Sequence, residues 1–339
     1  MASSTPSPDL RQSGRGRQLA VWLFGIGVST GLLVLLYRIV DVRLVGSTLR
    51  DAHPGWLLVS VGFIAPLTAL RALRFMWIVP RDARPGFGDA FRMTLVAGTF
   101  NMFMPAKTGD LVKSVAIARH QEATGSLGVA AVVYERLADL FALLLWGAAG
   151  LLASQAWLTV APWAWVLVAI MSAACGAIIW SVRPMAVLLA GVSRIRLGGR
   201  TPRLVEAVVA RTHGWPRLHD DLRGRRGWLM LLSLVIGFLQ LSQIWMFAMT
   251  VQVVVPFTAC VALAAAVLLV GQLPLTFGGM GARDVAFVVL FADRASPEAA
   301  AAMGLLSATR GILPALAGLV VMKSHLAAVV DTVRDWQRP

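Results

Sequence analysis

Six charged side chains lie inside apolar stretches of this 339-residue chain, and their types and spacing could do chemistry. Glu135 and Asp139 are four residues apart and share one face of a helix, and Arg136 can reach Asp139 at a spacing of three. Each charge at a bilayer centre costs roughly 2.5–3.5 kcal/mol on insertion scales, so these residues should face a wet cavity or one another. The six are Arg71, Arg74, Glu135, Arg136, Asp139 and Arg310.

The chemistry that an arginine-lined cavity suits best is the binding of phosphate. A guanidinium group bonds phosphate with two parallel donors and keeps its charge. In a membrane, phospholipids and polyprenyl phosphates carry that group. Arg310 lies near the middle of the last apolar stretch and is the strongest single candidate.

Structural readings of the same charges stay open. Glu135, Arg136 and Asp139 could pair with one another and lock two helices together. Arg71 and Arg74, three residues apart on one face, lie near the inner boundary of their stretch, from which Arg74 in particular could extend to water.

Further candidates lie at two breaks that contain proline and glycine, residues 105–110 and 274–281. Asp110 and Asp284 mark the starts of half-helices, whose free N–H groups and positive dipole favour an anion, although an acid at a helix start can also be a simple cap. Basic residues flank both breaks. The predicted substrate-binding residues are Arg71, Arg74, Asn101, Lys107, Asp110, Lys113, Glu135, Arg136, Asp139, Arg283, Asp284 and Arg310.

The composition fixes the environment in which these residues work. Apolar residues make up 58% of the chain and charged residues 14%, against roughly 25% charged in a soluble domain. A soluble globule could not bury that much apolar surface, so the sequence predicts an integral membrane protein. The two cysteines lie in apolar runs and indicate neither a disulfide scaffold nor a redox role.

The elements that must position the charges are apolar helices. Six stretches are long enough to cross a bilayer, and two shorter ones, 91–104 and 257–273, run into the breaks, as re-entrant segments do. We therefore predict an all-α integral membrane protein of about six full transmembrane helices plus two re-entrant broken-helix hairpins; eight to ten helices would result if both hairpins crossed fully. The six stretches are residues 19–39, 55–79, 126–154, 156–182, 227–255 and 298–322.

The net charge of +14 predicts topology rather than nucleic-acid binding. Residues 183–227 hold ten arginines against three acidic residues, which is typical of a cytoplasmic loop and could also hold anionic lipid head groups. We expect a disordered basic tail over 1–17, a single transmembrane domain over 18–325 and a tail over 326–339. Both termini are then cytoplasmic, in the inner membrane of a cell.

Two parts of the chain share a charge pattern. Asp110 and Arg136 are 26 residues apart, and so are Asp284 and Arg310, at an offset of 174 that also carries Gly55 to Leu229. The first copy, about 55–154, would begin outside and the second, about 227–322, inside. This is the pattern of an inverted repeat, which places a substrate site near the membrane midplane.

The sequence lacks the motifs of several enzyme classes. It has no phosphate-binding loop for ATP and no metal-binding histidine or cysteine motif. We expect a transporter without cofactor or metal rather than an enzyme.

Three motifs together resemble a known family. They are Asn101-x3-Pro105-x3-Gly109-Asp110-x2-Lys113, Glu135-Arg136-x2-Asp139 and Pro274-x3-Gly278-Gly279-x-Gly281-x-Arg283-Asp284. The combination, over residues 20 to 325, is similar to the transmembrane region of lysylphosphatidylglycerol synthases, the flippase-like family. This chain has Asp110 and Asp284 where the family usually has glutamate, and Lys107 and Lys113 where it often has arginine.

The resemblance implies movement of a polar or aminoacylated lipid between leaflets. About 17 residues follow the last apolar stretch, so we expect no soluble aminoacyl-transfer domain and no synthesis of lysyl-lipid by this chain.

The predicted function is therefore that of a flippase or scramblase whose partners are membrane lipids with anionic or polar head groups. Two alternatives stay open. One is a membrane-embedded transferase that acts on a polyprenyl-phosphate- or phospholipid-linked substrate. The other is a non-catalytic partner of a lipid synthase or glycosyltransferase, docked through residues 183–227.

Overall fold

The computed structural model describes residues 25–104, 108–117, 125–155, 161–193, 214–272, 279 and 281–322. Within these ranges every regular element is a helix, as predicted. The predicted tails 1–17 and 326–339, residues 194–213 of the basic stretch 183–227, and Lys107 lie outside the described residues.

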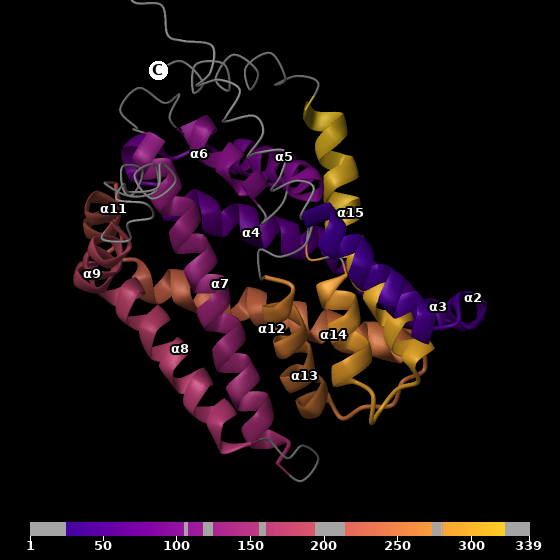
Figure 1. The fold of residues 1–339 in the computed structure, drawn as a ribbon. Coiled ribbons are helices and arrows are strands. Elements are labelled where there is room, and N and C mark those ends of the chain that lie inside the picture. The colour runs from indigo at the N-terminus through magenta and orange to yellow at the C-terminus, as the bar shows by residue number, and fades with distance from the viewer. Residues whose placement is uncertain are drawn as a thin grey trace, which may run out of the picture.

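Five helices are long and apolar enough to cross a membrane (Figure 1). They are α3 with α4 (Pro54–Gly62 and Ile64–Ile78), α7 (Gly125–Ala153), α8 (Pro162–Trp180), α12 (Arg226–Thr250) and α15 (Pro297–Met322). Each coincides with a predicted stretch to within a few residues, except that α8 begins at Pro162 rather than at 156. The chain is a multi-pass membrane protein.

The sixth candidate differs from the prediction of one straight span over 19–39. A helix over Gly25–Ile39 is followed by α2 (Val42–Arg50), and the two meet at an angle of 80°. Asp41 explains the new start, because its carboxylate accepts the N–H of Arg43 at 2.8 Å and caps α2. The number of spans is five, or six if this bent pair counts as one.

A second interruption lies within the predicted span 55–79. Helices α3 and α4 separate at Phe63. Pro66 has no N–H to donate to the carbonyl of Gly62, so the regular bonding pattern cannot continue through this point.

The two predicted short segments are also helical. They form α5 (Phe87–Phe103) and α13 (Phe257–Val270), which are 17 and 14 residues long. The end of the first break forms a 3-10 turn, η2 (Thr108–Asp110), and α6 (Leu111–Ile117) follows it; α14 (Ala282–Leu290) follows the second break. At 1.5 Å per residue, α13 is about 21 Å long and falls short of a hydrocarbon core of about 30 Å.

Each of the two short helices packs along a long helix from a distant part of the chain. Helix α5 lies along α15, and α13 lies along α7 (Figure 1). Two apolar clusters result, one centred on α12, α13 and α15, the other on α4, the start of α7 and α11 (Trp215–Asp221). Along α7 the buried residues of the second cluster end at Tyr134, and those of the first begin at Leu143. The charges of Glu135 and Asp139 therefore lie between the two apolar cores.

The described ends of the basic stretch 183–227 are more ordered than the predicted loop. Helix α9 (Val182–Ser193) follows α8, and α11 buries Trp215 to 2% exposure. Arg217 pairs with Asp82 of η1 (Arg81–Ala83), and Arg225 donates to the carbonyl of Trp77 at 3.1 Å. These arginines join helix ends at one side of the protein.

Burial and the charge of Arg226 lower the pKa of His219 in α11. A neutral His219 can accept a bond from the Arg226 guanidinium, and the two nitrogens, Nη2 and Nδ1, lie 2.6 Å apart.

Gly318→Ala should lower the stability of the protein. A Cβ at Gly318 would overlap the carbonyl oxygen of Leu95 and the hydroxyl of Thr99 in α5, and overpacking of this kind costs about 1–3 kcal/mol. In Gly311→Ala, on the same helix, the new Cβ meets nothing within 4 Å, and alanine favours the helix. Thermal unfolding in detergent should give a lower midpoint for the first variant and an unchanged or higher one for the second. Equal midpoints would contradict the close α5–α15 packing.

Candidate functional site

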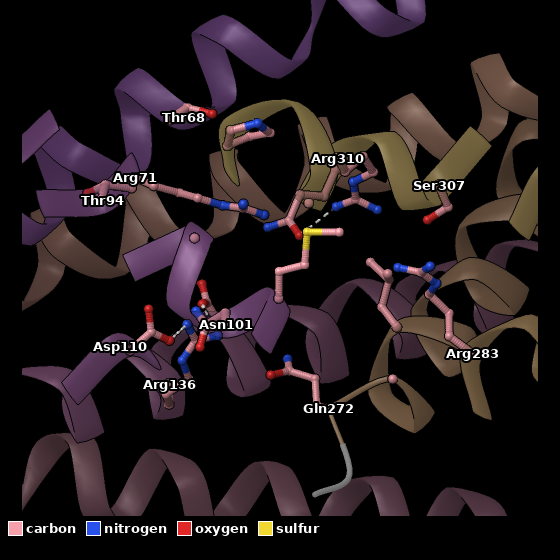
Figure 2. Close-up of a pocket in the computed structure, with 18 of the residues that line it drawn as sticks. Thr68, Arg71, Thr94, Asn101, Asp110, Arg136, Gln272, Arg283, Ser307 and Arg310 are labelled. Atoms are coloured by element: carbon pink, nitrogen blue, oxygen red, sulfur yellow. Dashed lines mark hydrogen bonds and ion pairs between the residues drawn. The ribbon is translucent and has the colours of Figure 1, made fainter. Parts of the chain in front are cut away.

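A cavity of about 240 Å³ lies among α4, α5, α7, α12, α13 and α15, and η2, α6 and the start of α14 also contribute to its lining (Figure 2). Nine of the twelve predicted binding residues line it. They are Arg71, Asn101, Asp110, Lys113, Glu135, Arg136, Asp139, Arg283 and Arg310. Of the other three, Arg74 lies directly behind the wall, Asp284 caps α14, and Lys107 is outside the described residues.

Arg74 of α4 links this helix to α7 and α12. Its Nη1 lies 2.6 Å from Asp139 Oδ1 and 3.2 Å from Ser233 Oγ, and its Nη2 lies 3.3 Å from Glu135 Oε1. The residue is 0% exposed, so the alternative in which it extends to water is wrong. The i,i+4 spacing of the two acids places both carboxylates in reach of one guanidinium group.

Lys113 and Arg136 complete this charge network. Lys113 Nζ lies 2.9 Å from Glu135 Oε2 and 3.7 Å from Asp110 Oδ1. Arg136 pairs with Asp110, and its Nη1 lies 3.9 Å from Asp139 Oδ2. The predicted contact between Arg136 and Asp139 is therefore present but long. Three cations and three carboxylates balance in this half of the cavity.

Arg71 and Arg310 differ from those residues because neither forms an ion pair with a carboxylate of the described residues. Figure 2 shows them extending toward each other from α4 and α15. Arg310 Nη2 donates to Gln240 Oε1 at 2.9 Å, and within the described part of the chain neither guanidinium lies within 4 Å of a carboxylate. Two arginines thus face the cavity without an ion pair to any described carboxylate.

Arg283 and Asp284 lie at the start of α14. Arg283 Nη2 is 3.6 Å from Asp284 Oδ1, while Asp284 Oδ2 accepts the N–H of Gly281 at 2.9 Å. Asp284 therefore acts as a cap, the simpler of the two predicted roles. Gly281 has φ of +88°, a conformation that side-chain-bearing residues rarely adopt, so the sharp entry to α14 needs glycine.

Several buried polar atoms at the cavity have no partner among the described residues. They include Ser307 Oγ, Arg283 Nε and Asn101 Oδ1. Pro314 lies inside α15 and lacks the N–H that would donate to the carbonyl of Arg310. Unpaired buried groups are costly, so this half of the cavity is suited to a polar ligand that bonds them.

Some lining residues were not predicted from the sequence. Gln240, Gln272 and Ser307 all line the cavity, and Gln240 bonds Arg310 directly. A signal was present for two of them. Gln240 is a polar residue in an apolar helix, and Ser307 precedes Arg310 by three residues on the same face.

All-helical architecture, apolar spans and a charged cavity among them define a multi-pass helical membrane protein. The chain belongs to the family of the lysylphosphatidylglycerol synthase transmembrane region, whose family model matches residues 22–318. This membership confirms the predicted resemblance and indicates a membrane protein of lipid metabolism or transport. No curated protein matches the chain.

Proposed function

We propose that this protein moves a phosphate-bearing lipid between membrane leaflets, as a flippase or scramblase. The observation that carries the proposal is the pair Arg71 and Arg310, which face one cavity and form no ion pair with a carboxylate of the described residues. A phosphate between them would receive the bidentate bonds for which guanidinium is suited.

The size of the cavity supports a lipid substrate. At about 240 Å³ it is smaller than the roughly 300–1,000 Å³ of pockets that enclose drug-sized ligands. It has room for a polar head group but none for acyl chains, which would stay in the surrounding lipid.

An inverted repeat would supply the movement, and the helix pairing supports it. An offset of 174 carries α5 to α13 and α7 to α15, so a two-fold relation exchanges the pair α5–α15 with the pair α13–α7. The two-fold relation adds 174 to the number of a residue in the first copy and subtracts 174 from the number of its contact in the second copy. The sum of the two residue numbers in a contact must therefore be the same in both helix pairs. Gly98 lies against Pro314 and Gly147 against Ala265, and the two numbers add up to 412 in each case. Rocking of the two halves could then expose the cavity to each leaflet in turn.

The proposal includes an orientation. The arginine-rich ends of residues 183–227 would lie at the cytoplasmic face of the inner cell membrane, with both termini on that side. The transferase alternative has less support, because each carboxylate that lines the cavity is already paired with a cation and none is free to act as a base.

A leaflet assay tests the proposal. Purified full-length protein is placed in liposomes with tail-labelled phospholipids, and an impermeant reductant bleaches the outer leaflet. We expect protein-containing liposomes to lose inner-leaflet fluorescence rapidly, either without energy input, which indicates a scramblase, or only with an ion gradient, which indicates a flippase. Folded protein that moves no phosphate-bearing lipid under either condition would refute the proposal.

A further inference from the structure

The charges in the cavity carry information about the head group itself. They divide into two halves, one neutral and one positive. In the neutral half, Asp110, Glu135 and Asp139 each have at least one cation partner within 4 Å. Those partners are Arg74, Lys113 and Arg136, so three negative and three positive charges cancel.

The other half contains Arg71, Arg283 and Arg310. The carboxylate close to them is that of Asp284, which lies 3.6 Å from Arg283 and is also bonded to the N–H of Gly281. Among the residues that the structure describes, three positive charges therefore meet one negative charge. Within the described part of the chain, the cavity therefore carries two positive charges in excess of the carboxylates close to it.

The unpaired polar atoms match the same picture. Ser307 Oγ, which is fully buried, and Arg283 Nε are donors without a partner among the described residues. Phosphate oxygens accept such bonds. An ammonium group on a ligand could bond the unpaired Asn101 Oδ1, but it would add a positive charge to the existing excess. To neutralise that group the cavity would have to offer a carboxylate, and each described one in its lining is already bonded to a cation. Taking one of them would leave a buried cation of the network unpaired, which is strongly unfavourable.

We propose that the cavity selects a terminal, doubly charged phosphate head group over a phosphodiester, and excludes head groups that carry an ammonium group, including aminoacylated lipids. A phosphate monoester carries a charge of about −1.5 to −2 near neutral pH, which matches the two free positive charges. Such a group occurs on phosphatidic acid and on polyprenyl monophosphates. This inference rests on the proposed function, since it names the substrate class of the same cavity.

Binding measured apart from transport tests the inference. Short-chain phosphatidic acid and phosphatidylmethanol are titrated into the detergent-purified full chain; they differ by one methyl group and one negative charge. Phosphatidylethanolamine of the same chain length supplies the ammonium group. We expect phosphatidic acid to bind about tenfold or more tightly than phosphatidylmethanol, as for the loss of one charge-assisted contact, and phosphatidylethanolamine to bind weakest.

A charge-removing variant sharpens the test. In Arg310→Gln one free positive charge remains, so the preference for phosphatidic acid over phosphatidylmethanol should largely disappear. The control is Arg92→Gln, which removes an arginine whose side chain is 57% exposed outside the cavity, and it should keep the preference. Equal binding of the two anionic lipids to the unmodified protein, or tighter binding of phosphatidylethanolamine, would overturn the inference.

Competition with a polyprenyl monophosphate identifies the anchor. If a polyprenyl monophosphate competes as well as phosphatidic acid, the terminal phosphate alone is recognised. If one of these two lipids competes much better than the other, the protein also recognises the hydrocarbon anchor of that lipid. Failure of this inference differs from failure of the proposed function. Movement of all head groups at equal rates refutes the selectivity alone, whereas selective binding without movement refutes transport alone.

Discussion

Arg74→Ala is expected to destabilise the protein by about 3–5 kcal/mol, the usual cost of removing one partner from a buried ion pair. The guanidinium group of Arg74 is fully buried and bonds Glu135, Asp139 and Ser233 at once. Without it, α4 loses its polar link to α7 and α12, and the network of three cations and three acids acquires an excess negative charge. Thermal or denaturant unfolding in detergent measures the change.

The matched control for this variant lies one turn earlier on the same helix. Arg71→Ala removes the same side chain, but Arg71 has no ion pair with any described residue. We expect the unfolding midpoint of Arg71→Ala to be close to that of the unmodified protein or above it, because the substitution removes a charge that has no ion pair with the described residues. If the two variants were equally stable, the division between a structural and a binding arginine would be wrong.

Arg310→Ala is expected to slow lipid translocation by about 10- to 100-fold with little loss of stability. The reason is that one charge-assisted contact to a phosphate is worth about 1.5–3 kcal/mol. Arg310→Lys keeps the charge but loses the planar pair of donors, so it should retain part of the activity. The leaflet assay described above provides the rate, and Arg92→Ala controls for loss of positive charge outside the cavity.

Gln240→Glu offers a second route to the same effect. Gln240 Oε1 already accepts from Arg310 at 2.9 Å, so a carboxylate there would pair with Arg310 and neutralise it without removing it. We expect slower translocation together with unchanged or higher stability. A fast Gln240→Glu variant would contradict the requirement for a free positive charge at Arg310.

The sequence predicted many of the residues that line the cavity, because a charged side chain in an apolar helix is too costly to leave in contact with lipid and must face a polar interior. Arg310, Arg136 and Glu135 stood out for that reason, and all three line the cavity. The same reasoning could not assign partners. Whether Arg74 extends to water or pairs inward depends on how α4 packs against α7 and α12. The spacing of residues along the sequence gives no information on that packing.

The fold shows the same division. Apolar length predicted the five long helices, but the 80° bend after Ile39 depends on a single cap at Asp41 that reads as an ordinary loop residue. Ser307 and Gln240 were not predicted as cavity residues. Neutral polar side chains are less costly in a membrane than charged ones, so their presence in an apolar helix is weaker evidence for a polar cavity. The order of α9 and α11 depends on contacts of Trp215 and Arg217 with distant helices.

Photochemical labelling from a lipid head group tests the central claim most directly. A phospholipid that carries a photoreactive group beside its phosphate is added to the full chain in liposomes, and labelled peptides are identified by mass spectrometry. The account predicts labels on cavity-lining residues of α5 and α15, such as Met102 and Ile312, that are competed by unlabelled lipid and reduced in Arg310→Ala. Labels confined to exposed residues of α8 and α9, such as Trp163 and Val187, would contradict it.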